Sequence, residues 1–378
     1  DGSGDEAIDN AGDMNFAGGA GTTVTIDAGD GTADLINSGT FDLGADSKVS
    51  SNDTLAISNT TGTVTVNAGA ELDVDDIDNQ AGGTIDNDGT ITLGSGQSLT
   101  NAGTLELAGT VDGSLVNNDD FDVDGNAEVT GNATNSGGDM DVTAGNTLIM
   151  GGTVFNTGGG TLDIAAGGEV DVTAGGLDLT NQDAGSTLTV NGTINGGLTN
   201  EMGATTSVTG AGDVTGAVTN SADLDLTGGT LGSLDNNAGG DVDVASGGAV
   251  DTTVNNAAAL DVNSGTLMVG GLTTNEATGG LTVHAGAKIE TDSLTNDGTI
   301  NVDGTLSGTG NTFNNAGTTN VGDGGTVDHA GAIDNLAGGT FNFNGSGTLE
   351  VDTDGSGDEA IDNAGDMNFA GGAGTTVT

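Results

Sequence analysis

Short segments in which apolar and polar residues alternate recur along the whole chain. A typical segment has an apolar residue, any residue and an asparagine, then a small-residue stretch and an apolar-polar-apolar triplet. Leu99-Thr100-Asn101 before Leu105-Glu106-Leu107 is a clear example. Alternation with a period of two indicates β-strands, and the intervening Gly, Asn and Asp favour turns. No 3.6-residue periodicity is present and these residues are poor helix formers, so the sequence predicts an all-β fold.

The asparagine that ends each such segment gives the spacing of the pattern. The asparagines expected to anchor successive coils are Asn10, Asn37, Asn59, Asn79, Asn101, Asn118, Asn135, Asn156, Asn181, Asn200, Asn220, Asn236, Asn256, Asn275, Asn296, Asn315 and Asn335, and the series restarts at Asn363. These 17 steps cover 353 residues, a mean of about 21 per step. A further candidate, Asn87, leaves the division of the step between Asn79 and Asn101 open.

A step of about 20 residues with strand-like triplets predicts one coil of a parallel β-helix. We expect a parallel β-solenoid that forms an elongated rod, with the apolar residues of successive coils stacked in a thin core. Steps of 16 to 28 residues favour a right-handed, roughly three-sided helix. At about 4.8 Å per coil, the 17 coils would rise roughly 80 Å. Glycines would supply the positive-φ corners. Asparagine also tolerates that conformation, and its amide can bond to the asparagine of the next coil.

A much longer repeat contains these coils. Residues 1–25 recur letter for letter as residues 354–378, so the longer unit has 353 residues. We expect residues 1–353 to be one tandem unit of about 17 coils, and residues 354–378 to be the start of the next. Because the second copy stops inside the run equivalent to Val24-Thr25-Ile26, we interpret the chain as a window of a longer protein with several units in series.

Composition excludes several classes of function. Hydrophobic residues make up 33% and aromatic residues 2%, with 74 glycines and no cysteine, too few bulky side chains for a thick globular core. The formal net charge is −54, and Lys48 and Lys288 are the only Lys or Arg residues. This charge excludes nucleic acid and anionic membranes as partners, and without an 18-residue apolar run we expect no membrane insertion. It favours a salty or divalent-rich medium, so we expect an extracellular location.

Residues for catalysis are nearly absent from the sequence. His284 and His329 have no neighbouring cysteine or recognisable nucleophile motif, and we expect both to face solvent on strands or turns. The glycine runs are not followed by the Lys-Ser/Thr of a phosphate loop. The chain contains no Arg, Tyr or Trp, the residues that line polysaccharide-cleaving grooves. We therefore expect a protein that is not an enzyme and requires no cofactor.

Stacked carboxylates are the first candidate for cation binding. Asp225, Asp243 and Asp261 are the middle residues of successive triplets, so in stacked coils they would form an outward-facing column. A second series has the same positions: Glu106, Asp122, Asp141 and Asp163. Hard oxygen ligands favour Ca²⁺. Such columns could bind Ca²⁺, or they could be a hydrated acidic face with diffuse counterions, and the sequence leaves both open.

A second candidate cation site lies where one unit meets the next. Asp352, Asp354, Asp358 and Glu359 alternate with small residues around a glycine turn, as in calcium loops. The segment departs from the EF-hand pattern, because position 12 counted from Asp352 is Asn363. It also departs from the calcium-binding nonapeptide repeat, so neither family's ligand set can be transferred to it. We keep it as a candidate Ca²⁺ loop.

The combination Asn-x-Gly-Thr-apolar-x-apolar carries a resemblance to a known group of proteins. It occurs at residues 87–93 (NDGTITL) and 37–43 (NSGTFDL). It resembles the β-helical stalks of large repetitive bacterial surface proteins, such as filamentous-haemagglutinin-like adhesins and autotransporter passengers, and it covers essentially the whole chain. The resemblance implies secretion, attachment to the cell surface, and roles in adhesion or matrix formation.

The sequence therefore favours a structural segment of an extracellular fibre or stalk. Its partners would be neighbouring repeat units of the same chain, joined end to end, and other fibres bundled laterally through divalent cations. One alternative is an adhesin that recognises a glycan or a host surface, although most phenylalanines occupy inward positions and leave few for a binding platform. Those expected to point inward are Phe16, Phe41, Phe121, Phe341 and Phe343. A remote alternative is ice binding, from Thr-x-Thr pairs such as Thr63-Val64-Thr65, but Asp or Asn interrupts most coils.

Overall fold

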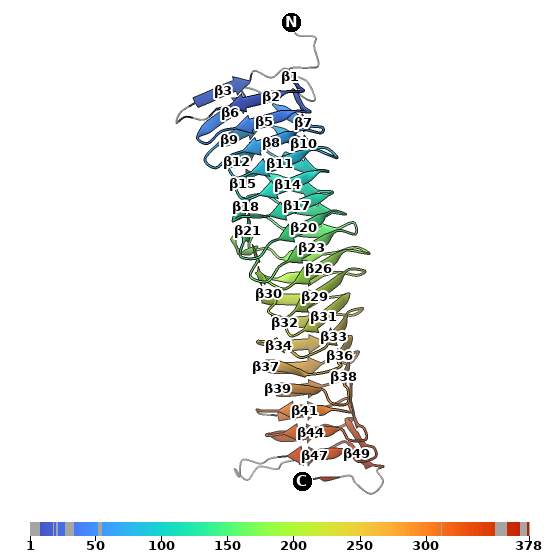
Figure 1. Ribbon diagram of the computed structural model, residues 1–378. Helices are drawn as coiled ribbons and strands as arrows, with labels where there is room; N and C mark the ends of the chain where they lie inside the picture. The colour runs from blue at the N-terminus through green and yellow to red at the C-terminus, as the bar shows by residue number, and fades with distance from the viewer. Residues whose placement is uncertain are drawn as a thin grey trace. The chain divides into compact units, whose positions relative to one another are not determined.

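The computed structural model describes residues 8–17, 19, 22–26, 34–51, 55–310, 312–351, 361–370 and 376–377. The chain divides into two compact units, Asp1–Gly197 and Leu198–Thr378, and each is a stack of β-coils whose strands pair in parallel (Figure 1). The one helical element in these ranges is a short 3₁₀ turn, η1 (Thr173–Gly175). No helix in the described ranges is long and apolar enough to cross a membrane. The predicted all-β parallel β-solenoid is confirmed.

Each coil of the first unit has three strands, which we assign in chain order to a first, a second and a third face. The first-face strands are β1 (Ile8–Asn10), β4 (Leu35–Asn37), β7 (Ala56–Asn59), β10 (Asp76–Asn79), β13 (Ser98–Asn101), β16 (Ser114–Asn117), β19 (Ala133–Ser136), β22 (Val154–Thr157) and β25 (Leu179–Asn181). The second-face strands are β2 (Asp13–Phe16), β5 (Thr40–Leu43), β8 (Thr63–Val66), β11 (Thr84–Asn87), β14 (Thr104–Leu107), β17 (Asp120–Val123), β20 (Asp139–Val142), β23 (Thr161–Ile164) and β26 (Thr187–Val190). The third-face strands are β3 (Thr22–Ile26), β6 (Ser47–Ser51), β9 (Glu71–Val74), β12 (Thr90–Leu93), β15 (Thr110–Asp112), β18 (Ala127–Val129), β21 (Thr147–Met150), β24 (Glu169–Asp171) and β27 (Thr193–Asn195).

The second unit has the same three faces, but some of its strands turn a corner without a break. Its first-face strands are β28 (Leu198–Asn200), β35 (Val254–Asn256), β42 (Thr312–Asn315), β45 (Ala332–Asn335) and β48 (Ile361–Asn363). Its second-face strands are β29 (Thr205–Thr209), β31 (Asp223–Thr227), β33 (Asp241–Val244), β36 (Ala259–Val262), β38 (Gly280–Val283), β40 (Thr299–Val302), β43 (Thr318–Val321), β46 (Thr340–Phe343) and β49 (Asp366–Phe369). Its third-face strands are β34 (Gly248–Val250), β41 (Thr305–Gly308), β44 (Thr326–His329), β47 (Thr348–Val351) and β50 (Thr376–Val377). The strands that run from the third face of one coil to the first face of the next are β30 (Asp213–Asn220), β32 (Thr230–Asn236), β37 (Thr266–Asn275) and β39 (Lys288–Asn296).

The core of each unit is a set of columns of apolar side chains. Strand alternation turns every second residue inward, and the register then places the inward residues of neighbouring coils over one another. One column of the second face is Phe41, Val64, Ile85, Leu105 and Phe121, and all five side chains are fully buried. Burial stabilises each such side chain by about 1.5–3 kcal/mol, so every added coil contributes core.

The phenylalanines lie largely where the sequence placed them. Phe41, Phe121, Phe341 and Phe343 are fully buried, as predicted, and Phe16 in the first described coil is half-buried. These four rings therefore lie in the core, where a sugar could not stack on them.

The corners of the coils depend on glycine more than on asparagine. Glycines such as Gly82 (φ 90°) take the left-handed conformation, and the described non-glycine residues with positive φ are Asp46, Asp183 and Ser246. The expectation that asparagine also occupies such corners is wrong for the anchor asparagines. They lie at the end of a strand or one residue before it, with their side chains inward, where the neighbouring coil can satisfy an amide.

Candidate functional site

A ladder of buried asparagine side chains runs through the first face of each unit. Asn101 shows the pattern: its Nδ2 donates to Oδ1 of Asn117 at 2.8 Å and to the carbonyl of Asp120 at 2.7 Å. Its own Oδ1 accepts from Nδ2 of Asn79 at 2.7 Å. Between successive members the amide–amide distance is 2.7–2.9 Å in the first unit and 2.6–3.0 Å in the second. Because buried amides are costly when unpaired, this ladder fixes the register of the coils.

The ladder includes the anchor asparagines that the sequence predicted, except that Asn117 takes the place of Asn118. Asn10 and Asn101 belong to the ladder of the first unit. In the second unit Asn200, Asn296 and Asn335 belong to its counterpart. The steps range from 16 residues at Asn101–Asn117 to 28 at Asn335–Asn363.

The exchange is that Asn117 carries the ladder and Asn118 does not. Leu115 pairs with Leu99 and Asn117 with Asn101, so in this short coil Asn117 points inward and Asn118 is exposed. The sequence allowed both, since an apolar residue precedes each of them by two positions, and only the register separates them.

Asn87 belongs to a different face. It lies on β11, where its register partners are Val66 and Leu107, so it replaces an apolar residue of the second-face core. Its Nδ2 donates to the carbonyl of Thr110 at 3.0 Å, and its Oδ1 accepts from the backbone N–H of Gly89 at 3.1 Å. One coil therefore contains both Asn79 and Asn87. This explains why the sequence left open how the step between Asn79 and Asn101 should be divided.

Stacked carboxylates on the second face form the candidate functional site. Phe121 and Val123 point into the core, so the residue between them, Asp122, points outward. The first acidic column, in the first unit, is Asp86, Glu106, Asp122, Asp141 and Asp163. The second acidic column, in the second unit, is Asp225, Asp243 and Asp261. Within each column, consecutive carboxylates lie on adjacent, paired strands.

Burial, and then neighbouring carboxylates, raise the pKa values of four members of the first acidic column. Partial burial, and then the neighbouring carboxylates of Asp120 and Asp124, raise the pKa of Asp122. Burial, Asp163 and Asp122 raise the pKa of Asp141, and the pKa values of Asp86 and Glu106 are raised by the same two causes. At the roughly 4.8 Å spacing of strands, two such charges repel by about 1 kcal/mol in water and about 3.5 kcal/mol at an effective dielectric of 20. The column therefore holds charge at a cost that any nearby cation would reduce.

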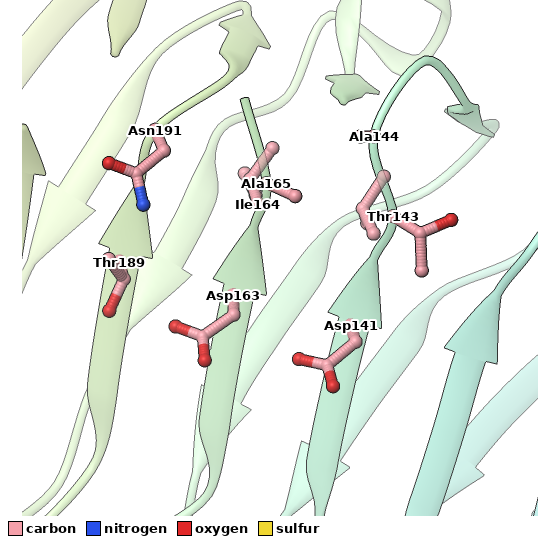
Figure 2. Close-up of a pocket in the computed structure, with 9 residues that line it drawn as sticks. Asp141, Thr143, Ala144, Asp163, Ile164, Ala165, Thr189 and Asn191 are labelled. Carbon is pink, nitrogen blue, oxygen red and sulfur yellow. The ribbon is translucent and has the colours of Figure 1, made fainter. Parts of the chain in front are cut away.

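A shallow hollow lies beside this column. It has a volume of about 440 Å³, and Asp141 and Asp163 are among its lining residues together with Thr189 and Asn191. Figure 2 shows the side chains of Asp141, Asp163 and Thr189 in a row on three neighbouring strands. Apolar residues and one threonine complete the lining: Val142, Thr143, Ala144, Ile164 and Ala165. The hollow can hold water or a small solute against two carboxylates.

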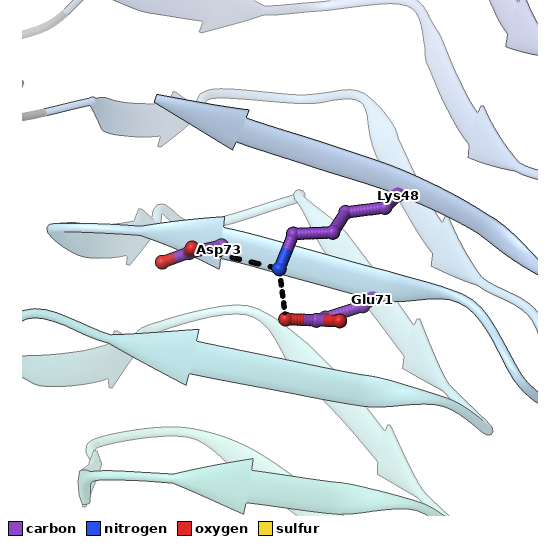
Figure 3. A network of polar contacts seen from close by, with 3 residues as sticks. All are labelled: Lys48, Glu71 and Asp73. Carbon is purple, nitrogen blue, oxygen red and sulfur yellow. Dashed lines mark hydrogen bonds and ion pairs between the residues drawn. The ribbon is translucent and has the colours of Figure 1, made fainter. Parts of the chain in front are cut away.

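The two lysines neutralise little of this charge. Lys48 of β6 reaches the next coil, where it pairs with Glu71 and lies 3.9 Å from Asp73 (Figure 3). Lys288 pairs with Glu290 at 2.8 Å. These pairs are about one-third to one-half exposed and stabilise the fold by no more than about 1 kcal/mol each. Both lysines lie on the third face, so neither one offsets an acidic column of the second face.

The described ranges contain no group of three or more His, Asp or Glu side chains placed as metal ligands are. Asp352, Asp354, Asp358 and Glu359, the candidate calcium loop, lie outside the described residues. Cation binding at the columns and at this loop stays a prediction.

The prediction that both histidines face solvent is wrong for His329. His284 is exposed, as predicted, but His329 is only 2% exposed and points from β44 into the core of the coil. Its register partner is Gly308, and a Cβ at that position would lie 2.2 Å from the ring. The ring fills the space that glycine leaves, a complementarity invisible in sequence because the two residues are one coil apart.

A second asparagine ladder, on the outside of the second unit, was not foreseen. Nδ2 of Asn320 donates to Oδ1 of Asn301 at 3.0 Å, and Nδ2 of Asn342 donates to Asn320 at 2.9 Å. Asn368 continues the series to Asn342 at 2.9 Å. The repeated middle asparagine of triplets such as Ile300-Asn301-Val302 was the signal that could have revealed it.

No protein-family model matches this chain, and no curated protein matches its sequence.

Proposed function

We propose that this chain is a structural segment of an extracellular fibre or stalk, built from tandem β-solenoid units and used for surface attachment, cell–cell contact or matrix formation. The observation that carries the proposal concerns the second copy of the 25-residue repeat. Its strands β48, β49 and β50 pair in parallel with β45, β46 and β47 of the preceding coil. A following 353-residue tandem unit can therefore begin as one more coil, so that tandem units in series add length.

The contacts between coils suit a load-bearing element. Within each of the two compact units, described neighbouring coils bond to one another through parallel strand ladders and a buried asparagine amide, as at Asn101–Asn117 and Asn296–Asn315. The stability of such arrays is nearly additive along the stack. The charge of −54 would keep separate fibres apart at low salt, whereas divalent cations on the acidic columns would allow lateral bundling. The resemblance to β-helical stalks of bacterial surface proteins supports the same function and an extracellular location.

The proposal is tested by chains that contain one, two and three of the 353-residue tandem units in series. Electron microscopy should show fibres whose contour length increases by roughly 80 Å per unit, from about 4.8 Å per coil. Separate bodies joined by flexible segments would contradict it.

Two further measurements address location and the alternative function. Antibodies against the chain should label intact, unpermeabilised cells of the source organism, and absence of surface label would contradict the extracellular role. A glycan array probed with the single unit should show no selective ligand, and strong selective binding would instead favour an adhesin.

A further inference from the structure

One part of the second face in the second unit carries no charge. The outward residues of β40, β43 and β46 are threonines and asparagines, and all of them are at least partly exposed. We call them the neutral patch: Thr299, Asn301, Thr318, Asn320, Thr340 and Asn342. On β31, β33 and β36 of the same face, the equivalent middle residues are the aspartates of the second acidic column. In a chain with a formal charge of −54, the neutral patch is a place where another body can approach the sheet without facing a carboxylate on it.

The register arranges these six side chains as two straight columns, one of threonines and one of asparagines. Nδ2 of Asn320 donates to Oδ1 of Asn301 at 3.0 Å, and Nδ2 of Asn342 donates to Oδ1 of Asn320 at 2.9 Å. An amide has two N–H groups and two acceptor lone pairs, so this ladder uses one of each at Asn320. The ladder therefore orders the asparagine side chains, and it leaves the amide of Asn320 the capacity for one further bond of each kind.

A partner for this surface needs the same spacing and both kinds of hydrogen-bonding group. The columns repeat at about 4.8 Å along the stack. A second copy of the neutral patch meets both conditions by identity, because it has the same spacing and offers amide N–H groups, amide oxygens and hydroxyls. Asparagine ladders also favour pairing between identical sheets, in which like side chains interdigitate. A second copy of this chain is therefore the occupant that fits the neutral patch best.

We propose that the neutral patch is a lateral contact between two copies of this chain. The two copies are related by a two-fold axis that runs along β43, so that their second units stack in opposite directions. Thr318 and Asn320 then face their own equivalents, and Asn301 faces Asn342 of the second copy. Such a contact is isologous, because the same surface on both copies forms it and closes the dimer.

Charge selects this orientation over the parallel one. The second acidic column ends on β36, and β38 lies between β36 and β40. If the two second units stacked in the same direction, the aspartates of one column would face those of the other at the same level and repel them. In the opposite direction the two columns lie on opposite sides of the two-fold axis, so they do not meet.

The contact is small and should depend on salt. With about 4.8 Å between strands and about 3.3 Å per residue, the neutral patch covers roughly 150–200 Å², whereas a stable interface buries about 800 Å² on each partner. Single chains should therefore associate weakly. The turns beside the patch carry Asp297, Asp303 and Asp323, all exposed, so association should strengthen as salt screens them. In joined tandem units, a step that rests on the proposed function, the patch would recur in each unit and the weak contacts would reinforce one another.

The test uses the full chain with Thr318→Cys, since the sequence contains no cysteine of its own. Facing sheets lie about 10 Å apart, too far for a direct disulfide, so a bis-maleimide that spans about this distance joins the thiols. Asn314→Cys, on the first face of the same coil, measures random collision, and each rate is normalised to the reaction of that thiol with a monofunctional maleimide. In about 0.3 M NaCl with chelator present, Thr318→Cys should form covalent dimers about tenfold faster than Asn314→Cys, because the contact holds the two thiols together.

Two matched charges separate the neutral patch from other effects. Asn320→Asp in the Thr318→Cys chain puts like charges face to face and should reduce the crosslinking rate to the collision level. Asn314→Asp adds the same charge to the same coil on its first face and should leave the rate unchanged. Amide exchange of residues 312–343 reports whether Asn320→Asp loosens the coil. If it does, Asn301→Asp takes its place, because a carboxylate there still accepts from Asn320.

The orientation has a readout of its own. In the proposed arrangement Thr299 of one copy faces Thr340 of the other. A mixture of Thr299→Cys and Thr340→Cys chains should therefore crosslink mainly as mixed dimers. Dimers of each variant with itself would indicate the parallel contact and contradict the proposed axis.

The inference is overturned if Thr318→Cys reacts no faster than Asn314→Cys, if the charges at Asn320 and Asn314 have the same effect, or if dimers form only with Ca²⁺. Protection of residues 299–343 by dextran in place of a second copy would also overturn it, and would assign the neutral patch to a glycan. Axial imaging of joined units does not depend on lateral contacts, so failure here would leave the proposed fibre function to its own experiments.

Discussion

Replacing Asn117 by alanine, with Asn118→Ala as its control, separates a ladder amide from an adjacent exposed one. Nδ2 of Asn117 donates to Oδ1 of Asn135 at 2.9 Å and to the carbonyls of Asp119 and Asp139 at 3.0 and 2.8 Å. Its Oδ1 accepts from Nδ2 of Asn101 at 2.8 Å. The substitution removes the two N–H donors that serve these three acceptors and the one oxygen that accepts from Asn101, and it interrupts the ladder between two coils.

The expected loss follows from the net value of such bonds. Each contributes about 0.5–1.5 kcal/mol, and a buried group left without a partner costs about 1–3 kcal/mol. We expect Asn117→Ala to lower the free energy of local unfolding by about 3–5 kcal/mol. Asn118 is exposed, so Asn118→Ala should stay within about 0.5 kcal/mol of the unaltered chain.

Hydrogen exchange read by mass spectrometry is the suitable assay, because solenoids open locally and a single global transition would dilute the effect. Peptides covering residues 98–142 should lose protection by about 10²- to 4 × 10³-fold in Asn117→Ala, since each 1.4 kcal/mol is about a factor of ten. Peptides from the second unit should be unchanged. Equal protection in the two variants, or a larger loss in Asn118→Ala, would refute the assignment of the ladder.

Four further predictions test other parts of the molecule. Burial lowers the pKa of His329, so the unfolded chain binds a proton first, and stability should fall as the pH drops below about 6.5; His329→Gln should remove this loss in urea titrations. The raised pKa of Asp122 has the opposite sign, because stability falls as the pH rises from about 3.9 through the folded-state pKa and stays low above it; Asp122→Asn should stabilise by roughly 0.5–1 kcal/mol at pH 7, less at high salt. Gly308→Ala should destabilise by about 1–3 kcal/mol, because its Cβ would lie 2.2 Å from the His329 ring, measured by the same titrations. If the loop at residues 352–359 binds Ca²⁺, millimolar calcium should raise the melting temperature and chelator should reverse it.

Each of these predictions has an outcome that would contradict it. Acid sensitivity retained in His329→Gln would place its origin elsewhere, and a stabilisation by Asp122→Asn no larger than that of Asp297→Asn, at an exposed turn, would remove the role of the acidic column. Gly308→Ala should lose most of its effect in a His329→Ala background, and equal destabilisation there would contradict the proposed ring contact. A melting temperature unchanged by calcium and chelator would exclude the loop as a stabilising site.

The coil architecture could be predicted because it depends on local periodicity. An alternating triplet fixes which side chains point inward, and the small residues beside it mark the corners. The outward position of Asp122 follows from the inward positions of Phe121 and Val123 alone, so the acidic columns were also predictable once coils were assumed to stack.

What sequence reasoning missed depends on register between coils. Asn117 and Asn118 are equivalent in pattern and differ only in which one lies over Asn101. The burial of His329 depends on the missing side chain of Gly308 one coil away. Four strands of the second unit also cross a corner without a break, with register shifts such as that between Val269 and Leu272. Their corners contain turn-forming residues such as Gly270-Gly271, so the sequence does not distinguish a continuous corner from an interrupted one.

The central claim is that one 353-residue tandem unit passes into the next as an uninterrupted stack of coils. Axial imaging of a chain with several tandem units tests this claim most directly. The 17 predicted coils at about 4.8 Å each give an axial repeat of roughly 80 Å per unit, with the coil spacing continuous through each junction. A repeat far from this value, or a gap in the coil spacing where residues 354–378 begin, would contradict the account.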